Sequence, residues 1–124
     1  MKLEDLPIQS MSAVRARDRE TWLGLFEEDA VVEDPVGGFD PWDLTGEGQR
    51  GREAIGRFYD MFCSMQESLD FDVSYTVACG NEVACFVTMT LVMKDGSTNN
   101  QKMINVYKVS PAGKIASLRS FWNA

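Results

Sequence analysis

The spacing of apolar residues changes once along this chain, near Glu67, and that change constrains the fold more than any other feature. Before it, apolar residues recur every three or four positions, which is the period of one helix face. After it, apolar and polar residues alternate, which is the period of a strand with one buried face. A chain whose helices precede its strands is typical of an α+β domain.

Three helices are expected in the first half of the chain. Residues 3–14 form a loosely amphipathic stretch, and Asp18 is placed to cap a second, short helix over residues 19–26. Residues 51–65 carry apolar side chains at i, i+3, i+4 and i+7, which predicts a third helix with a strong apolar face. Between the second and third helices, residues 30–34 contain β-branched Val31 and Val32 and are followed by Pro35, so a short strand is expected there.

Four strands are expected in the second half, at residues 71–79, 82–93, 98–109 and 114–122. Turn-forming residues separate them at 80–81, 94–96 and 111–113, as in an antiparallel meander. We expect a curved, mainly antiparallel sheet that wraps round the helices and leaves a conical pocket, with the short strand at its edge. The 124 residues and 44% hydrophobic content fit one domain spanning residues 1–124.

Residues 37–50 are rich in Gly, Asp and Pro and predict a long loop, a kind of segment that is often functional. Phe39, Trp42 and Leu44 are expected to fold down from it, because apolar groups are costly to leave in water. Residues 46–51 match GxGxxG and Asp70 follows at about the spacing of a dinucleotide-binding unit. The context argues against that function, because no buried strand precedes the glycines and antiparallel hairpins follow.

Composition excludes several classes of function. The net charge of -7 and pI near 4.5 argue against binding to nucleic acid or to an anionic membrane. The sequence has no histidine, which excludes Ser-His-Asp and Cys-His catalysis and the commonest zinc sites. The acids at 27–29 and at 40 and 43 match no calcium-loop spacing. We therefore expect no metal site.

The cysteines indicate a reducing compartment. Cys63, Cys79 and Cys85 are odd in number and lack CxxC spacing, so they are expected to be reduced core residues of a cytoplasmic protein. Residues 1–11 carry acids and a proline where a signal peptide has an apolar stretch, and no run reaches membrane-spanning length. The sequence therefore predicts a soluble cytoplasmic protein.

Asp34 is the sharpest candidate for chemistry, because it ends the apolar strand that Pro35 terminates. Alternation places Asp34 on the same face as Val32 and turns Glu33 away. A carboxylate in apolar surroundings has a raised pKa, which suits a group that takes and returns a proton. The alternative is a solvated strand end, since most aspartates lie in water.

Three of the predicted strands carry polar residues on one face. These faces hold Gln101, Met103, Asn105 and Tyr107 on one strand, Phe86, Thr88 and Thr90 on another, and Leu118, Ser120 and Trp122 on the last. If the faces point into the cone they line a pocket, and if they point outward they meet solvent or a second subunit. The sequence leaves this orientation open.

Three segments carry a resemblance to a known family: DRETWLGLFEEDAVVEDPVG, GREAIGRFYD and GKIASLRSFWN. In this order they resemble the ketosteroid isomerase and SnoaL-like polyketide cyclase superfamily, whose cone is also that of nuclear transport factor and cystatin-like folds. The similarity runs from about residue 10 to residue 122. It implies that Asp34 is a general base, that the ligand is a small hydrophobic cyclic molecule, and that the protein is a cofactor-free homodimer paired through the exposed face of its sheet.

The resemblance also assigns roles to other residues. Ketosteroid isomerase uses a tyrosine and a protonated aspartic acid as its oxyanion hole, and these positions fall on Ser10 and Asn105 here. Asn105 remains able to donate a hydrogen bond to an enolate, and Tyr59 keeps a supporting tyrosine. The positions expected to bind substrate are Phe26, Phe58, Phe86, Thr88, Thr90, Gln101, Met103, Leu118, Trp122 and, on the loop, Trp42.

Three functions follow from these residues. The first is an isomerase or cyclase that moves a proton next to a carbonyl, with Asp34, Asn105 and Tyr59 as its catalytic groups. The polar Thr88, Thr90 and Gln101 would then indicate a ligand with more polar substituents than a steroid. The second is a binding module for a hydrophobic ligand, without chemistry. The third is a hydrolase or dehydratase in which Asp34 activates water.

Overall fold

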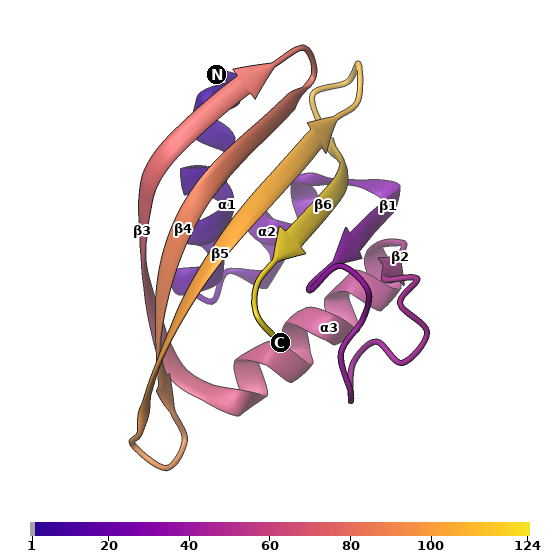
Figure 1. The fold of residues 1–124 in the computed structure, drawn as a ribbon. Coiled ribbons are helices and arrows are strands. Elements are labelled where there is room, and N and C mark those ends of the chain that lie inside the picture. Colours follow the sequence, from indigo (N-terminus) through magenta and orange to yellow (C-terminus); the bar gives the residue numbers. More distant parts are fainter. Residues whose placement is uncertain (1) are drawn as a thin grey trace.

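The computed structural model describes residues 2–124, and helices and strands follow in nearly the expected order (Figure 1). A short 3-10 turn, Leu3–Asp5, leads into the first helix, α1 (Leu6–Arg15). The other two helices are α2 (Arg19–Gly24) and α3 (Arg52–Met65). The strands are β1 (Phe26–Glu33), β2 (Gln49–Arg50), β3 (Gln66–Cys79), β4 (Glu82–Met93), β5 (Thr98–Val109) and β6 (Ile115–Phe121). Asp18 caps α2 as predicted, since its carboxylate accepts a hydrogen bond from the Thr21 amide.

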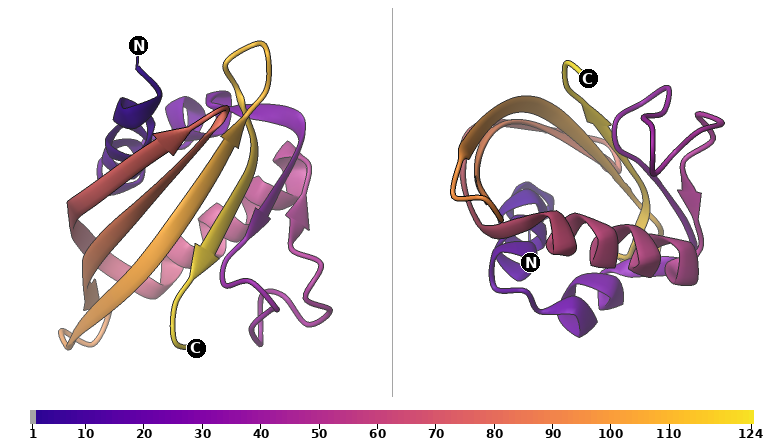
Figure 2. Two further views of the ribbon diagram at one scale, coloured as in Figure 1. Left: turned by 45° about the horizontal axis from the view of Figure 1, so that its top comes forward. Right: turned by 90° about the horizontal axis from the view of Figure 1, so that it is seen from below.

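The six strands form one curved sheet in the order β2-β1-β6-β5-β4-β3. β1 pairs with β6 in parallel, and every other neighbouring pair is antiparallel. Figure 2 shows the sheet curling over α3, with α1 and α2 on the same concave side. The expected α+β fold, with helices packed on a curved and mainly antiparallel sheet, is confirmed.

The core lies between the helices and the concave face of the sheet. On β4 every second residue from Val83 to Leu91 is buried, and the residues between them are less so. Ile55, Phe58 and Tyr59 face them from α3, and Phe26 enters from the start of β1. Each large apolar side chain removed from water in this way contributes about 1.5–3 kcal/mol, which holds the helices against the sheet.

Several boundaries differ from those expected. α2 ends at Gly24, so Phe26 begins a strand rather than closing a helix. β1 is longer than residues 30–34 and lies inside the sheet, because its partners β2 and β6 come from distant parts of the chain. β3 begins at Gln66, five residues earlier than expected, and two residues of the predicted loop form β2.

One of the three cysteines also lies differently from the expectation. Cys85 is buried and Cys63 half-buried, but Cys79 is exposed because it ends β3 at a hairpin turn, so its assignment to the core was wrong. Asp70 is exposed and pairs with Arg15 at 3.1 Å. Within residues 2–124, no helix has both the length and the apolar character needed to cross a membrane.

Candidate active site

The concave side of the sheet and the helices enclose a pocket of about 230 Å³ with a mostly apolar wall. Five of the seven methionines line it, namely Met11, Met65, Met89, Met93 and Met103. All three tryptophans of the chain, Trp22, Trp42 and Trp122, line it too. An apolar cavity with a few polar groups is the usual form of a small-molecule site.

Asp34 lies in the wall of this pocket, one residue beyond the end of β1. The indole nitrogen of Trp122 donates a hydrogen bond to its Oδ1 at 2.6 Å, and that of Trp42 donates to its main-chain oxygen at 2.6 Å. Two residues further on, the Val36 amide donates to the Ser120 carbonyl at 2.9 Å. Asp34 is thus fixed through its carboxylate to Trp122, just beyond β6, and through its main chain to the following loop.

The surroundings of Asp34 favour its protonated form. The residue keeps some accessible surface toward the pocket, but protein encloses its carboxyl group, and this burial raises the pKa of Asp34 to about 6. The hydrogen bond from Trp122 stabilises the charged form and opposes the rise. The result is a base that is mostly ionised at neutral pH yet accepts a proton far more readily than a solvated aspartate.

The loop at residues 37–50 folds over the Asp34 side of the pocket. The buried Asp43 carboxylate accepts hydrogen bonds from the amides of Gly46 and Gly48, at 3.0 and 3.1 Å. At Gly48, which has φ +80°, a Cβ would meet the Val32 carbonyl oxygen at 2.6 Å, so the loop can approach β1 this closely only with glycine there. Leu44 was expected to fold down, but it is 77% exposed at the outer tip.

An aromatic cluster forms where this loop meets the pocket. The ring centroids of Phe39 and Trp42 are 4.7 Å apart, and those of Phe39 and Trp122 are 5.3 Å apart. Trp42 also meets Phe58 of α3 edge-on at 6.0 Å. Gln49 donates a hydrogen bond to the Trp42 carbonyl at 2.6 Å, which ties the cluster to β2. These rings form an apolar border to the pocket that Asp34 also lines.

Polar groups gather in another part of the pocket wall. The Ser120 hydroxyl donates to Asn105 Oδ1 at 2.5 Å, so the Asn105 amide nitrogen is left as the donor. Ser10 lines the same pocket, and its Oγ accepts a hydrogen bond from Trp22 at 3.1 Å. Tyr59 and Tyr107 both line the pocket, and neither buried hydroxyl has a hydrogen-bond partner among the residues described. Burial is the main cause that raises the pKa of Tyr59 to about 12, and burial also raises the pKa of Tyr107, so both phenols stay protonated.

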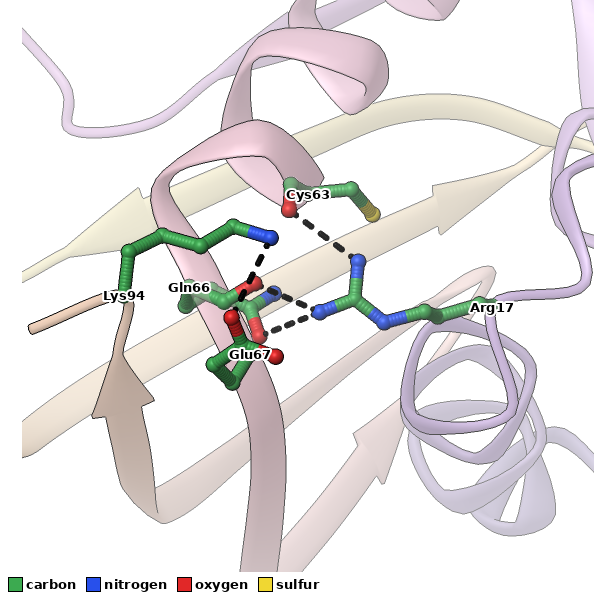
Figure 3. Close-up of polar contacts among 5 residues, drawn as sticks. All are labelled: Arg17, Cys63, Gln66, Glu67 and Lys94. Carbon is green, nitrogen blue, oxygen red and sulfur yellow. Dashed lines mark hydrogen bonds and ion pairs between the residues drawn. The ribbon is translucent and has the colours of Figure 1, made fainter. Parts of the chain in front are cut away.

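Gln66 is a pocket residue that the sequence did not reveal. Figure 3 shows the Arg17 guanidinium donating to the carbonyl of Cys63 at 3.0 Å and to the carbonyl and Oε1 of Gln66 at 2.7 and 2.9 Å. Beside them, Lys94 pairs with Glu67 at 3.5 Å. Gln66 joins α3 to β3 and belongs to neither apolar pattern, so no periodic signal marks it.

Most of the expected site residues do meet in the pocket. Those that line it are Asp34, Trp42, Phe58, Tyr59, Gln101, Met103, Asn105, Leu118 and Trp122. Met89 and Leu91, which were not expected, replace the predicted residues of β4. Within residues 2–124, no three His, Cys, Asp or Glu side chains come close enough together to hold a metal ion.

Four expected pocket residues lie elsewhere. Phe26 is fully buried in the core against Trp22, at 4.8 Å, and does not reach the pocket surface. The other three, Phe86, Thr88 and Thr90, point to the outer face of the sheet. The β4–β5 register explains this, because Cys85 pairs with Asn105 and Met89 with Gln101, and directly opposite residues share a face. The inward set of β4 is therefore the odd-numbered one.

Comparison with known proteins agrees with this geometry. The model of the SnoaL-like domain matches residues 8–118. The structure of RV0760c from Mycobacterium tuberculosis in complex with estradiol-17beta-hemisuccinate is similar, with a TM-score of 0.84 and 31% identity over 94% of this chain and 90% of that one. The Delta 5-3-ketosteroid isomerase from Mycobacterium sp. gives a TM-score of 0.84 and 31% identity, over 94% of this chain and 89% of that one.

A more distant structure shares the fold alone. SalBIII, an epoxide hydrolase/cyclase-like enzyme of pyran ring formation in the polyether salinomycin, has a TM-score of 0.80 and 21% identity over 96% of this chain and 88% of that one. No curated protein sequence matches the chain. The family match covers most of the residues that build the pocket, from α1 to β6. The chain therefore belongs to the SnoaL-like domain family.

Proposed function

We propose that this protein is an enzyme that moves a proton between carbons next to the carbonyl of a cyclic hydrophobic substrate, with Asp34 as the general base. The observation that carries the proposal is the Asp34 carboxylate, held by Trp122 in an apolar pocket with a pKa raised to about 6 by burial. The likeness to a ketosteroid isomerase at 31% identity supports it.

The proposed reaction has two proton transfers. Asp34 removes a proton from the carbon next to the carbonyl. The electron pair of that C–H bond forms a C=C bond to the carbonyl carbon, and the carbonyl group becomes an enolate with its charge on oxygen. Asn105 accepts a hydrogen bond from Ser120 at its Oδ1. Its amide nitrogen donates a hydrogen bond to the enolate oxygen. Asp34 then returns the proton to a second carbon, and no co-reactant is consumed.

The pocket wall favours a substrate of steroid-like or polyketide-like character. Thr88 and Thr90 face outward and add nothing polar to it, so the case for a ligand more polar than a steroid now rests on Gln101 alone among those three. Methionine and aromatic side chains make up much of the remaining surface. Such walls suit flat or puckered rings with few polar substituents. RV0760c, the similar protein, has been crystallised with a steroid ester.

The test is Asp34→Asn, assayed by the ultraviolet absorbance of the conjugated enone formed from a β,γ-unsaturated cyclic ketone. We expect turnover to fall about 100- to 10,000-fold, the usual contribution of a general base, with ligand affinity kept. Glu33→Gln is the matched control, because Glu33 is the adjacent carboxylate and faces Arg119 at 3.3 Å outside the pocket. Unchanged turnover in Asp34→Asn excludes the mechanism.

A binding module without chemistry is the second candidate, and one observation favours it. The two positions that an isomerase uses as its oxyanion hole hold Ser10 and Asn105, and Ser10 Oγ is engaged by Trp22. A designed 17-OHP binder with 28% identity and a TM-score of 0.84 shares the fold. Saturable binding of a cyclic ligand with no product from the unmodified protein would favour this function. A hydratase or cyclase with Asp34 as the base for water would instead form a product from an epoxide or an enone.

We also propose that two copies pair through the outer face of the sheet. Exposed apolar side chains gather there on four strands: Tyr75, Val77, Phe86, Ile104 and Phe121. A shallow hollow lined by Phe86, Ile104 and Phe121 lies on the same face. Contiguous apolar surface of this kind is typical of a protein interface, and a second copy presents the same surface to it.

A further inference from the structure

The Tyr107 hydroxyl is the most unusual polar group in the pocket. Tyr107 has 0% of its surface exposed, it lines the pocket, and its hydroxyl has no hydrogen-bond partner among residues 2–124. Leaving a buried donor unpaired costs about 1–3 kcal/mol. A phenylalanine would fill the same space without that cost, so the hydroxyl is best explained by a partner that the pocket receives.

The neighbours of this hydroxyl define what the partner is. Residues 105 and 107 are two apart on β5, so Asn105 and Tyr107 project from the same face of the strand. Burial is the largest influence on the pKa of Tyr107 and raises it, and the polar side chains of Ser10 and Asn105 lower it, although neither meets hydrogen-bond geometry with the phenol oxygen. Asp34 is close enough for its charge to raise that pKa as well. Two donors, the phenol and the amide, therefore share the pocket with one base.

We propose that Tyr107 is a catalytic residue that donates one of the two hydrogen bonds to the enolate oxygen, with Asn105 donating the other. The inference rests on the proton-transfer function proposed above. Ser10, the position that the resemblance assigns to the oxyanion-hole tyrosine, has a short side chain whose oxygen already accepts from Trp22. The phenol thus comes from β5 instead of α1.

The chemistry balances without transfer of the Tyr107 proton. When Asp34 takes the C–H proton, the C–H electron pair becomes part of a new C=C bond and the carbonyl π pair moves onto oxygen. That oxygen accepts hydrogen bonds from the Tyr107 O–H and the Asn105 N–H. Both donors keep their protons, and the electron pair returns when Asp34 protonates the second carbon. Donors fixed in advance at a developing charge are an efficient form of catalysis.

Tyr59 has the other buried hydroxyl without a partner, and its surroundings differ. After burial, the next causes that raise its pKa involve Cys63, one turn later on α3, and the charge of Arg17 lowers it. Its place on α3, near Cys63 and Arg17, fits the supporting role expected for it, and Tyr107 is the phenol on the same strand face as Asn105.

The experiment compares Tyr107→Phe with Tyr75→Phe, which removes the same atom from a tyrosine that is 68% exposed on the outer face. Calorimetry measures binding of equilenin, a phenol that mimics the enolate, and of 3-deoxyequilenin, which lacks the oxygen. Tyr107→Phe is expected to weaken equilenin binding ~10-fold, with deoxyequilenin unaffected. It is also expected to lower kcat ~100-fold with little change in KM.

Thermal unfolding separates this role from a structural one. Because Tyr107→Phe removes an unpaired buried donor and keeps the ring, the unliganded variant is expected to be as stable as the parent protein or more so. A hydroxyl with a purely structural role would lower the melting temperature when removed, and would weaken binding of both ligands alike. That result would overturn the proposal.

The outcomes keep the two proposals apart. If the parent protein turns over the β,γ-unsaturated cyclic ketone and Tyr107→Phe matches it in kcat and equilenin affinity, Tyr107 is not a donor and Asp34 remains the base. If the parent protein forms no product but Tyr107→Phe still loses equilenin affinity selectively, the phenol is a donor to a bound oxygen, though not a catalytic one, and the proton transfer is wrong. If the parent protein binds neither equilenin nor 3-deoxyequilenin and forms no product, both the proton transfer by Asp34 and the donor role of Tyr107 are wrong.

Discussion

At the scale of single residues, the pKa of Asp34 links function to stability. Its value of about 6 in the folded protein lies above the ordinary 3.8, because burial disfavours the charged form. A raised carboxyl pKa means that the fold binds the proton more tightly than the unfolded chain does. The stability that this provides is complete below about pH 4 and is lost as the pH rises through about 6.

Asp34→Asn is therefore expected to be more stable than the parent protein at pH 8, by up to about 3 kcal/mol at 1.36 kcal/mol for each pKa unit. At pH 4 the two should differ little, since the parent carboxyl is then protonated. Urea unfolding at both pH values measures the difference. A gap of the same size at both would mean that the substitution acts through packing and not through the charge.

At the scale of elements, the loop at residues 37–50 depends on one carboxylate. Asp43→Ala leaves the amides of Gly46 and Gly48 without their acceptor, so we expect a loss of about 1–3 kcal/mol in stability and faster hydrogen exchange at both amides. Ligand binding should weaken as well, because the loop holds Trp42 against the pocket. Glu47→Ala is the control, since Glu47 is an exposed acid of the same loop. Equal exchange in the two variants would contradict this role for Asp43.

Local patterns were sufficient to predict most of the elements. The helical period of residues 51–65 and the alternation after Glu67 placed α3 and the four-stranded meander, because side-chain spacing along one element depends only on that element. The length and neighbours of β1 were not predictable in this way. They come from pairing with β6, more than 80 residues away, and with β2, whose two residues have no strand pattern of their own.

Part of the candidate site was likewise unpredictable, because it depends on the register in which the strands pair. Asp34, Asn105 and Trp122 line the pocket, as the resemblance implied, although alternation alone left the orientation of the last two open. For β4, alternation gave two equally regular faces, and only its register against β5 selects the odd-numbered one. Phe86 was therefore assigned to the wrong side of the sheet.

At the scale of the whole molecule, the same Phe86 serves as a test of pairing. It is 37% exposed on the outer face of the sheet, among other apolar side chains. Phe86→Glu places a charge at the centre of the proposed interface, and we expect it to halve the mass measured by light scattering, from a pair of 13.9 kDa chains to one. Leu44→Glu, on the exposed loop tip, should leave the mass unchanged. A parent protein that already runs as a single chain would disprove the pairing.

The placement of the tryptophans has a practical consequence. Because all three indoles border one pocket and the sequence has no other tryptophan, the tryptophan fluorescence of the protein originates from that pocket's wall. Entry of a ligand changes the polarity around the indoles, and an aromatic ligand also accepts their excitation energy. The unmodified protein therefore reports occupancy of its own site, and unlabelled compounds can be screened by emission alone before any reaction is known.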